Sequence, residues 1–218
     1  MINLYNMDCM EALQAAPDNY WDLAIVDPPY GINRDKEVIK EYTEKRLCKW
    51  KKPKHKNYIK KDWDKQPPNK IYFDELFRVS KKQIIWGANY FNGYLPTTGG
   101  RIIWDKKTSM PTFSQGEIAF ISCIKSVKFF RFLWNGFAKA EPINRIHPTE
   151  KPIALYTWLL SKYAKKGDKI LDTHLGSGSS AIAAHKAGYD FWGYEIDKDY
   201  FNAASKRLKE AQRQLLLF

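Results

Sequence analysis

Short runs of apolar residues, each bounded by charged residues, glycine or proline, recur along the chain and predict β-strands. The runs cover residues 2–5, 23–26, 83–86, 101–104, 117–122, 169–171 and 191–194. A further run at 127–134 predicts an additional arm in the form of a hairpin. About seven strands are therefore expected in the main body of the protein.

Segments with the apolar spacing of helices lie between several of these runs. One begins near Pro152, carries apolar side chains at positions 153, 156, 160 and 163, and is closed by Gly167. The last begins at Asp197, a helix-capping residue type, and places apolar side chains at 200, 204, 208, 211 and 215. This alternation predicts a single α/β domain over residues 1–218, with a Rossmann-like, mostly parallel, twisted sheet and helices on both faces.

Composition agrees with one globular domain and disfavours several other classes. The 218 residues are 44% hydrophobic and 15% aromatic, which is enough to bury a core. Cys9, Cys48 and Cys123 form no Cys-x-x-Cys pair, so neither a disulfide framework nor a metal site is expected. No apolar stretch reaches membrane-spanning length, and the first ten residues do not resemble a signal peptide. We therefore expect a soluble, cytoplasmic protein without membrane contact.

Most of the net positive charge lies in one segment. Residues 36–70 hold 13 Lys and Arg against 5 acidic residues, which accounts for +8 of the net +12. Aromatic residues are interleaved with these charges, so the segment could neutralise phosphates and stack on bases; a solvated, lysine-rich loop is the alternative. No strand or helix pattern appears at 31–69, which we interpret as a basic insertion. The candidate nucleic-acid contacts are Lys45, Arg46, Lys49, Lys51, Lys52, Lys54, Lys56, Lys60 and Lys61.

A glycine-rich turn follows the predicted strand at 169–171 and opens a helical segment. Gly176, Gly178 and Ala181 fit the pattern G-x-G-x-x-A, in which the glycines let the backbone approach a ligand closely. Glu195 ends the next predicted strand, where an acidic side chain can accept hydrogen bonds from ribose hydroxyls. This order of strand, loop, helix and acid favours a nucleotide-like ligand over a turn without a ligand.

A second motif, Asp27-Pro28-Pro29-Tyr30, directly follows the predicted strand at 23–26. This position is the carboxyl edge of the sheet, where open α/β sheets bind ligands. The two prolines lack backbone donors and leave carbonyl oxygens as acceptors, so the motif suits a ligand with an amino group. An ordinary turn with two prolines is the alternative, and only the combination of the two motifs makes the functional interpretation specific.

Together these motifs resemble the amino-methyltransferases of DNA that act on N6 of adenine or N4 of cytosine. The resemblance covers nearly the whole chain and follows the permuted β-class order, in which the tetrapeptide precedes the cofactor loop. The segment His147-Pro148-Thr149-Glu150-Lys151-Pro152 is similar to the family segment before the first cofactor strand, and Phe113-Ser114-Gln115-Gly116-Glu117 is also similar to the family. The resemblance implies the class I fold of S-adenosylmethionine-dependent methyltransferases.

The resemblance also implies roles for individual residues. Asp27, Pro28, Pro29 and Tyr30 are the implied catalytic residues. S-adenosylmethionine is the implied cofactor, with S-adenosylhomocysteine as its product, and the implied cofactor-binding residues are Asp8, His147, Thr149, Lys151, Asp172, His174, Gly176, Ser177, Gly178, Ser179 and Glu195. The family often has Pro-Phe after the first acid of its cofactor loop, whereas Thr173 and His174 stand there in this chain. His174 therefore either fills one wall of the methionine pocket or packs as a core histidine.

The implied reaction is a direct, in-line transfer of the methyl group to an exocyclic amino nitrogen of a base flipped out of the duplex. Asp27 and the carbonyl of Pro28 would accept the amino hydrogens while Tyr30 stacks on the base. Within the family, Asp rather than Ser at the first position favours adenine over cytosine. An RNA amino-methyltransferase and a catalytically silent nucleic-acid-binding partner remain alternatives, whereas a dinucleotide-dependent dehydrogenase has no use for the tetrapeptide.

Double-stranded DNA is the expected partner, in a bacterial or phage-infected cell. The basic insertion at 31–69 is expected to contact the DNA and to be mobile without it. Residues 125–146 are the candidate hairpin or target-recognition arm, and no segment matches a known docking motif from which a target sequence could be derived. Dimerisation of the chain and a cognate restriction endonuclease are both left open.

Overall fold

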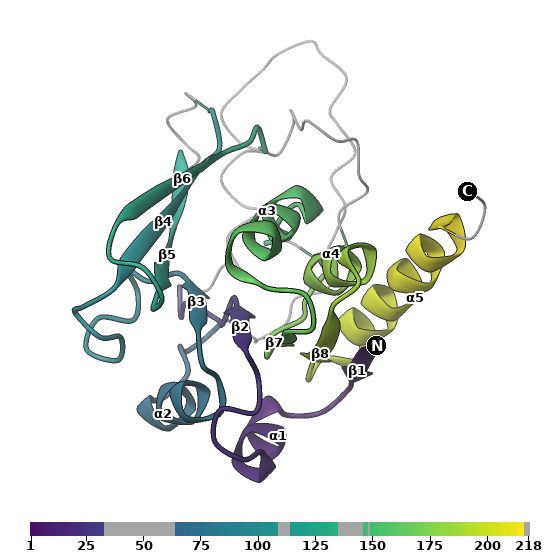
Figure 1. Cartoon of the computed structure of the whole chain (residues 1–218), viewed down its shortest axis with the longest axis horizontal. Helices are drawn as coiled ribbons and strands as arrows, with labels where there is room; N and C mark the ends of the chain where they lie inside the picture. Colours follow the sequence, from purple (N-terminus) through teal and green to yellow (C-terminus); the bar gives the residue numbers. More distant parts are fainter. Residues whose placement is uncertain (33–63, 109–113, 135–145, 148, 216–218) are drawn as a thin grey trace, which may run out of the picture.

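The computed structural model describes residues 1–32, 64–108, 114–134, 146–147 and 149–215 (Figure 1). Within these ranges the strands are β1 (Ile2–Tyr5), β2 (Leu23–Val26), β3 (Gln83–Trp86), β4 (Gly100–Asp105), β5 (Gly116–Ile121), β6 (Val127–Arg131), β7 (Lys169–Asp172) and β8 (Asp190–Tyr194). The helices in the same ranges are α1 (Cys9–Ala15), α2 (Lys70–Val79), α3 (Ile153–Tyr163), α4 (Ser179–Ala187) and α5 (Lys198–Leu215).

These strands form one sheet of eight, in the order β1-β8-β7-β2-β3-β5-β4-β6. β5 pairs antiparallel with both β3 and β4, while the other neighbouring pairs are parallel. Among the described strands, β5 therefore runs against all the others. The predicted mostly parallel α/β sheet is confirmed. It has eight strands rather than about seven because β6 joins its edge.

The first part of the expected hairpin arm forms the edge strand β6. β6 pairs in parallel with β4, from Val127 opposite Arg101 to Arg131 opposite Asp105. β6 is therefore an edge strand of the main sheet, and a hairpin within 125–146 stays a prediction. Residues 135–145 lie outside the described residues, and the recognition role of the segment at 125–146 stays a prediction.

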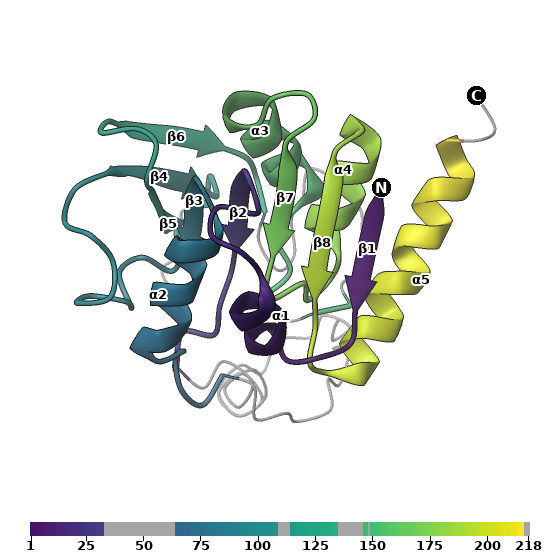
Figure 2. The ribbon, with the colours of Figure 1, turned by 60° about the horizontal axis from the view of Figure 1, so that its bottom comes forward.

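Helices cover both faces of the sheet, as expected (Figure 2). Successive side chains of a strand point to opposite faces, and β2 illustrates this alternation. Leu23 and Ile25 belong to the core under α3, α4 and α5, whereas Ala24 and Val26 belong to the core under α1 and α2. Every residue of β2 and of its neighbour β3 is buried, as is typical of central strands in a sheet covered on both faces.

The two helices expected from the sequence are present, but α3 ends at Tyr163 with Ala164 as its C-cap, before the predicted Gly167. α3 begins directly after Pro152. At the start of α5, Oδ1 of Asp197 accepts hydrogen bonds from the backbone N–H groups of Asp199 and Tyr200, at 2.9 and 3.1 Å. Tyr200, Ala204 and Leu208 form the buried stripe that packs α5 on the sheet. No helix of the described part of the chain is long and apolar enough to cross a membrane.

Candidate active site at the carboxyl ends of β2 and β7

Both sequence motifs lie at one edge of the sheet, at the ends of two neighbouring strands. β2 pairs in parallel with β7, with Leu23 opposite Ile170. Asp27 directly follows β2, and Asp172 is the last residue of β7. Strand pairing therefore places these two acids, which are far apart in the sequence, at the edge where open α/β sheets bind ligands.

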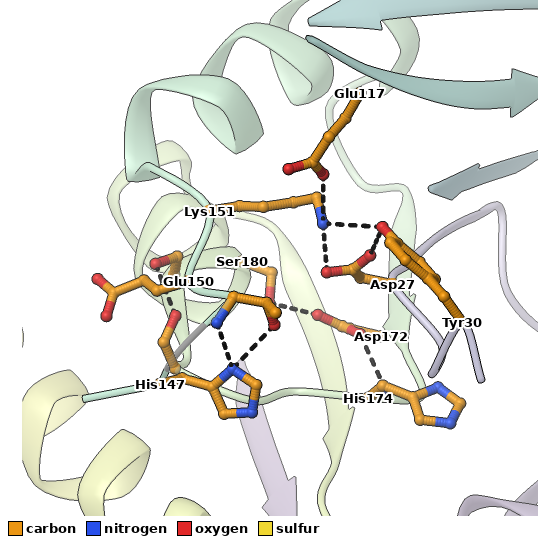
Figure 3. Close-up of polar contacts among 12 residues, drawn as sticks. Asp27, Tyr30, Glu117, His147, Glu150, Lys151, Asp172, His174 and Ser180 are labelled. Atoms are coloured by element: carbon orange, nitrogen blue, oxygen red, sulfur yellow. Dashed lines mark hydrogen bonds and ion pairs between the residues drawn. The ribbon is translucent and has the colours of Figure 1, made fainter. Parts of the chain in front are cut away.

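Both carboxylate oxygens of Asp27 contact side chains of the site (Figure 3). Oδ1 accepts a hydrogen bond from the Tyr30 hydroxyl at 2.6 Å, and Oδ2 accepts one from the ammonium of Lys151. The Lys151 nitrogen also lies 3.3 Å from the Tyr30 hydroxyl oxygen. Lys151, which precedes α3, is only 3% exposed. A residue expected at the cofactor thus lies against the candidate catalytic acid.

Glu117 of β5 and Lys106, which follows β4, extend this cluster away from Asp27. Nζ of Lys151 lies 3.1 Å from Oε2 of Glu117, and Nζ of Lys106 lies 2.6 Å from Oε1 of the same carboxylate. These four side chains alternate in charge, from Asp27 through Lys151 and Glu117 to Lys106. They come from four separate parts of the chain, so only the folded sheet brings them together.

The charges and the burial of this cluster shift its pKa values. Burial raises the pKa of Asp27; Lys151 opposes this rise and Glu117 adds to it. Burial would also raise the pKa of Glu117, but Lys151 and Lys106 outweigh it and lower that pKa to about 2. Burial disfavours the ammonium of Lys151, yet the two carboxylates outweigh burial and raise its pKa. Glu117 and Lys151 are therefore held in their charged forms, whereas burial favours the neutral form of Asp27.

The ring and backbone of Tyr30 are fixed by residues on three sides. Oδ1 of the buried Asp64 accepts hydrogen bonds from the backbone N–H groups of Tyr30 and Gly31, at 2.8 and 2.9 Å. The ring of Tyr90 stacks on Tyr30 with a centroid distance of 4.9 Å and an interplanar angle of 16°. Gly87 has a φ of +75°, and a Cβ there would lie 2.3 Å from the Tyr30 ring. Only glycine at this position leaves room for the ring.

Asp172 is held by neutral hydrogen bonds. Its Oδ2 accepts a hydrogen bond from the Ser180 hydroxyl at 2.6 Å, and its Oδ1 accepts one from the backbone N–H of His174 at 3.0 Å. Burial raises the pKa of Asp172 to about 7, against the effect of these two donors. Burial likewise lowers the pKa of His174 to about 4, although Asp8 opposes that change. The rings of His174 and Tyr72 meet edge to face with a centroid distance of 5.4 Å, which agrees with a packing role for His174.

The glycine loop has the backbone geometry that the motif predicts. Gly176 and Gly178 have φ values of +51° and +73°, and Gly178 caps the start of α4. A Cβ on Gly178 would lie 3.0 Å from the Cβ of Ala204 on α5. Oε2 of Glu195 accepts a hydrogen bond from the backbone N–H of Gly176 at 2.9 Å. The predicted ribose acceptor therefore also fixes the loop in place.

The segment that contains His147 lies over this loop. A Cβ on Gly176 would point toward the His147 ring, at 3.9 Å. Nδ1 of His147 lies 3.1 Å from the hydroxyl oxygen of Thr149. From α5, Arg207 donates to the carbonyl of Ser177 at 3.0 Å, and it pairs with the fully buried carboxylate of Glu150 at 3.1 Å. Arg207 thus joins the glycine loop to the segment above it.

Most of the predicted site residues share this edge of the sheet, and several of their partners were not predicted. Asp8 caps α1, and its side chain accepts a hydrogen bond from the backbone N–H of Met10 at 2.9 Å. Lys106, Arg207 and Asp64 were missed because long-range contacts alone bring them to the site. The predicted DNA-contacting residues between 45 and 61 lie outside the described residues, and their role stays a prediction. In the described ranges, no group of three or more His, Cys, Asp or Glu side chains could hold a metal ion.

Comparisons with protein families and curated proteins agree on one relationship. A family model described as DNA methylase matches residues 50–206. The Type II methyltransferase M.HinfI of Haemophilus influenzae is 25% identical over 250 aligned positions, covering 93% of this chain and 67% of that protein. The Type II methyltransferase M2.DpnII of Streptococcus pneumoniae is 30% identical over 110 residues, covering 50% of this chain and 41% of that protein. The match thus spans less than half of the M2.DpnII chain.

Solved structures with the same fold include two methyltransferases. A putative DNA modification methylase of Thermus thermophilus, complexed with S-adenosyl-L-methionine, superposes with a TM-score of 0.59 at 18% identity, covering 97% of this chain and 96% of that one. The cytosine-N4-specific PvuII DNA methyltransferase superposes with a TM-score of 0.57 at 10% identity, covering 98% of this chain and 92% of that one. At these identities the likeness confirms the expected class I fold.

Proposed function

This chain belongs to the DNA methylase family, and from that premise we propose that it transfers a methyl group from S-adenosylmethionine to N6 of adenine in DNA. The observation that carries the proposal is the position of Asp27 beside the glycine loop. A carboxylate acceptor follows β2, and a loop with the geometry of a nucleotide cradle follows the neighbouring strand β7. The two halves of a methyl-transfer site are therefore next to each other.

The residues at the end of β7 fit S-adenosylmethionine. The positive φ values of Gly176 and Gly178 shape a turn that side chains would obstruct, so a ligand can approach the backbone closely. Glu195 lies at the end of β8, where its carboxylate could accept hydrogen bonds from ribose hydroxyls. The His147 ring lies 3.9 Å from the position of a Cβ on Gly176, and Thr149 contacts His147. When bound, this cofactor supplies an electrophilic methyl group on a sulfonium centre.

Asp27 and Pro28 would prepare the nucleophile. The lone pair of an exocyclic amino nitrogen is delocalised into the base, so the site has to localise it. The Asp27 carboxylate and the Pro28 carbonyl would each accept one amino hydrogen and favour a more tetrahedral nitrogen. On receiving the methyl group, the amino nitrogen would give up one proton, which the Asp27 carboxylate could accept. Its raised pKa suits that role.

Tyr30 would stack on the target base. The parallel ring of Tyr90 stacks on Tyr30 at a centroid distance of 4.9 Å, and the base would stack against this pair of rings. An amino group inside a duplex cannot reach Asp27, so the base would leave the helix at a cost of a few kcal/mol. The hydrogen bond from the Tyr30 hydroxyl to Asp27 occupies the oxygen that an amino group would need. We therefore expect this bond to be exchanged when the base enters.

Substrate and partners are part of the same proposal. The Asp at the first position of the tetrapeptide favours adenine over cytosine, as in the family that it resembles. Double-stranded DNA is the proposed substrate, contacted by the basic side chains at 45–61. Cytosine N4 is the second candidate, because the PvuII enzyme with the same fold is cytosine-N4-specific.

Identification of the methylated nucleoside tests this proposal. The chain is incubated with tritium-labelled S-adenosylmethionine and undermodified genomic DNA, and the DNA is digested to nucleosides for mass analysis. We expect label in N6-methyladenine. Label in N4-methylcytosine would keep the reaction and replace the base, and label in RNA but not DNA would replace the substrate class. Absence of transfer to either nucleic acid would contradict the proposal.

A further inference from the structure

The buried cluster behind Asp27 extends beyond the residues that a methyl transfer needs. Lys151 lies between two carboxylates, Asp27 on one side and Glu117 on the other (Figure 3). Glu117 has a second cation, Lys106, at 2.6 Å. The target base would reach Asp27, whereas Glu117 and Lys106 lie behind Lys151. Lys151 is the side chain that contacts both Asp27 and Glu117.

The ammonium of Lys151 is shared between two carboxylates. It donates hydrogen bonds to Oδ2 of Asp27 and to the Tyr30 hydroxyl, and it forms an ion pair with Oε2 of Glu117 at 3.1 Å. The same nitrogen lies 5.5 Å from the centre of the Trp86 ring, on its apolar side. A stronger interaction with one carboxylate is therefore made at the expense of the other.

Because the cluster is buried, the sharing of the Lys151 ammonium between the two carboxylates has a strong effect on each of them. Lys151 has a side-chain exposure of 3%, and the side chains of Asp27, Glu117 and Lys106 are 17%, 23% and 17% exposed. Charges that are shielded from water interact more strongly than charges on a surface, because the effective dielectric constant is lower. A change of one charge in this cluster should therefore shift the pKa values of the neighbouring charged groups.

We propose that Glu117 and Lys106 are positioning residues that set how much of the Lys151 charge reaches Asp27. Glu117 draws the ammonium away from Asp27, and Lys106 limits that pull by neutralising Glu117 from the other side. The inference deepens the proposed function and rests on it in one respect, since only the ionised form of Asp27 can take up the proton that the amino group releases. The two outer residues would thereby set the pH range in which the site works.

The two outer residues have opposite predicted effects on the ionisation of Asp27. In Glu117→Gln, Lys151 keeps Asp27 as its one anionic partner and a neighbouring negative charge is lost, so the pKa of Asp27 falls. In Lys106→Met, Glu117 loses its second cation and competes more strongly for Lys151, so the pKa of Asp27 rises. A role limited to packing would not shift the same pKa in opposite directions.

Other groups near Asp27 stay the same in both variants. Tyr30 donates to its carboxylate, and Tyr72, Tyr156 and Asp172 also interact with it electrostatically. None of these groups is changed by either substitution. The difference between the variants and the unaltered protein therefore isolates the effect of Glu117 and Lys106.

The decisive experiment is a carbon-13 NMR titration of the aspartate carboxyl carbons in the full chain, with the Asp27 signal assigned from Asp27→Asn. We expect its pKa to move down in Glu117→Gln and up in Lys106→Met, each by about one pH unit. Lys70→Met is the matched control, because it removes a lysine from an exposed pair with Asp74 and should leave the Asp27 signal unchanged. Shifts in the same direction, or no shift in either variant, would overturn the proposal.

A folding check and a pH profile of kcat complement the NMR titration. If Glu117→Gln fails to fold by circular dichroism, the upward shift in Lys106→Met decides alone. The acid limb of the pH profile of kcat should move in the same directions as the Asp27 pKa. If the unaltered protein transfers no methyl group, the proposed function fails, while the NMR titration of the free protein still decides the arrangement of charges.

Discussion

The carboxyl ends of β2 and β7 are neighbours in one sheet, yet each holds its aspartate by different means. Asp27, after β2, contacts the buried ammonium of Lys151, which Glu117 and Lys106 support from behind. Asp172, at the end of β7, is held by the Ser180 hydroxyl and a backbone N–H. The first acid is part of an ion-pair cluster, and the second is part of a neutral hydrogen-bond network.

This difference would suit the two tasks that we propose for these acids. An acid that accepts hydrogens from a substrate has to remain charged and reachable, and Asp27 keeps 17% of its side-chain surface exposed. An acid that shapes a loop needs fixed geometry, and Asp172 is 2% exposed. The same residue type at equivalent strand ends is therefore suited to chemistry in one place and to loop structure in the other. Substitutions in the ion-pair cluster and in the glycine loop should therefore have different effects.

Removal of the central cation should have the largest effect. In Lys151→Met, Asp27 and Glu117 keep their burial and lose their shared ammonium, so we expect a loss of about 3 kcal/mol in the free energy of unfolding. Urea denaturation at pH 8 measures this loss. The matched control is Lys70→Met, whose exposed pair with Asp74 should change stability by no more than about 0.5 kcal/mol. Similar small losses in both variants would mean that the cluster behind Asp27 is not stabilised by its charges.

Obstruction of the glycine loop should have the next largest effect, on cofactor affinity. Gly178→Leu would place a side chain against Ala204 and push the loop away from its ligand. We expect the dissociation constant for S-adenosylmethionine, measured by calorimetry, to rise about tenfold, equivalent to about 1.4 kcal/mol.

Gly188 provides the control for backbone strain. It has a φ of +74°, close to the +73° of Gly178, but nothing lies within 4 Å of its missing Cβ. Gly188→Leu should therefore leave the cofactor affinity unchanged. Equal weakening in both variants would attribute the effect to backbone strain alone and would contradict the argument that contact with Ala204 displaces the loop.

The smallest expected effect is a pH dependence caused by Asp172. Its pKa is about 7 in the folded protein and 3.8 without the fold, so the folded state binds more protons between these values. Stability from this group is fully present below the lower value and is lost as pH rises toward 7. From pH 5.5 to 6.5 the loss should be about 1 kcal/mol. Asp172→Asn cannot titrate, so its unfolding free energy should fall less over this range; parallel curves would contradict the assignment.

Much of the fold was predictable from the sequence because most strands and the helices α3 and α5 carry their own local signals, whereas α1 and α2 were not identified. The four apolar residues of β2 and the capped, amphipathic α5 were recognised without any knowledge of the partners that they pack against. The parallel pairing of β6 was not predictable, because residues 127–131 are equally compatible with a hairpin. Strand partners depend on contacts between distant segments, and the local pattern does not contain them.

The candidate site was predictable only where a motif is contiguous. The tetrapeptide at 27–30 and the glycine loop were found because their chemistry depends on adjacent residues. The sequence indicated Lys151 through its segment, but not that its ammonium lies on Asp27. Lys106 and Arg207 are single basic residues in a chain with 36 Lys and Arg, so nothing local distinguishes them from surface residues. Their roles follow from the folded sheet.

The most direct test of the division between the two strand ends compares cofactor binding with methyl transfer in Asp27→Ala. Calorimetry with S-adenosylmethionine gives the first quantity, and transfer of tritium to DNA gives the second. If Asp27 acts on the base while the loop after β7 holds the cofactor, transfer should fall by about a thousandfold and the dissociation constant should stay within about threefold. A loss of cofactor affinity as large as the loss of transfer would contradict that division.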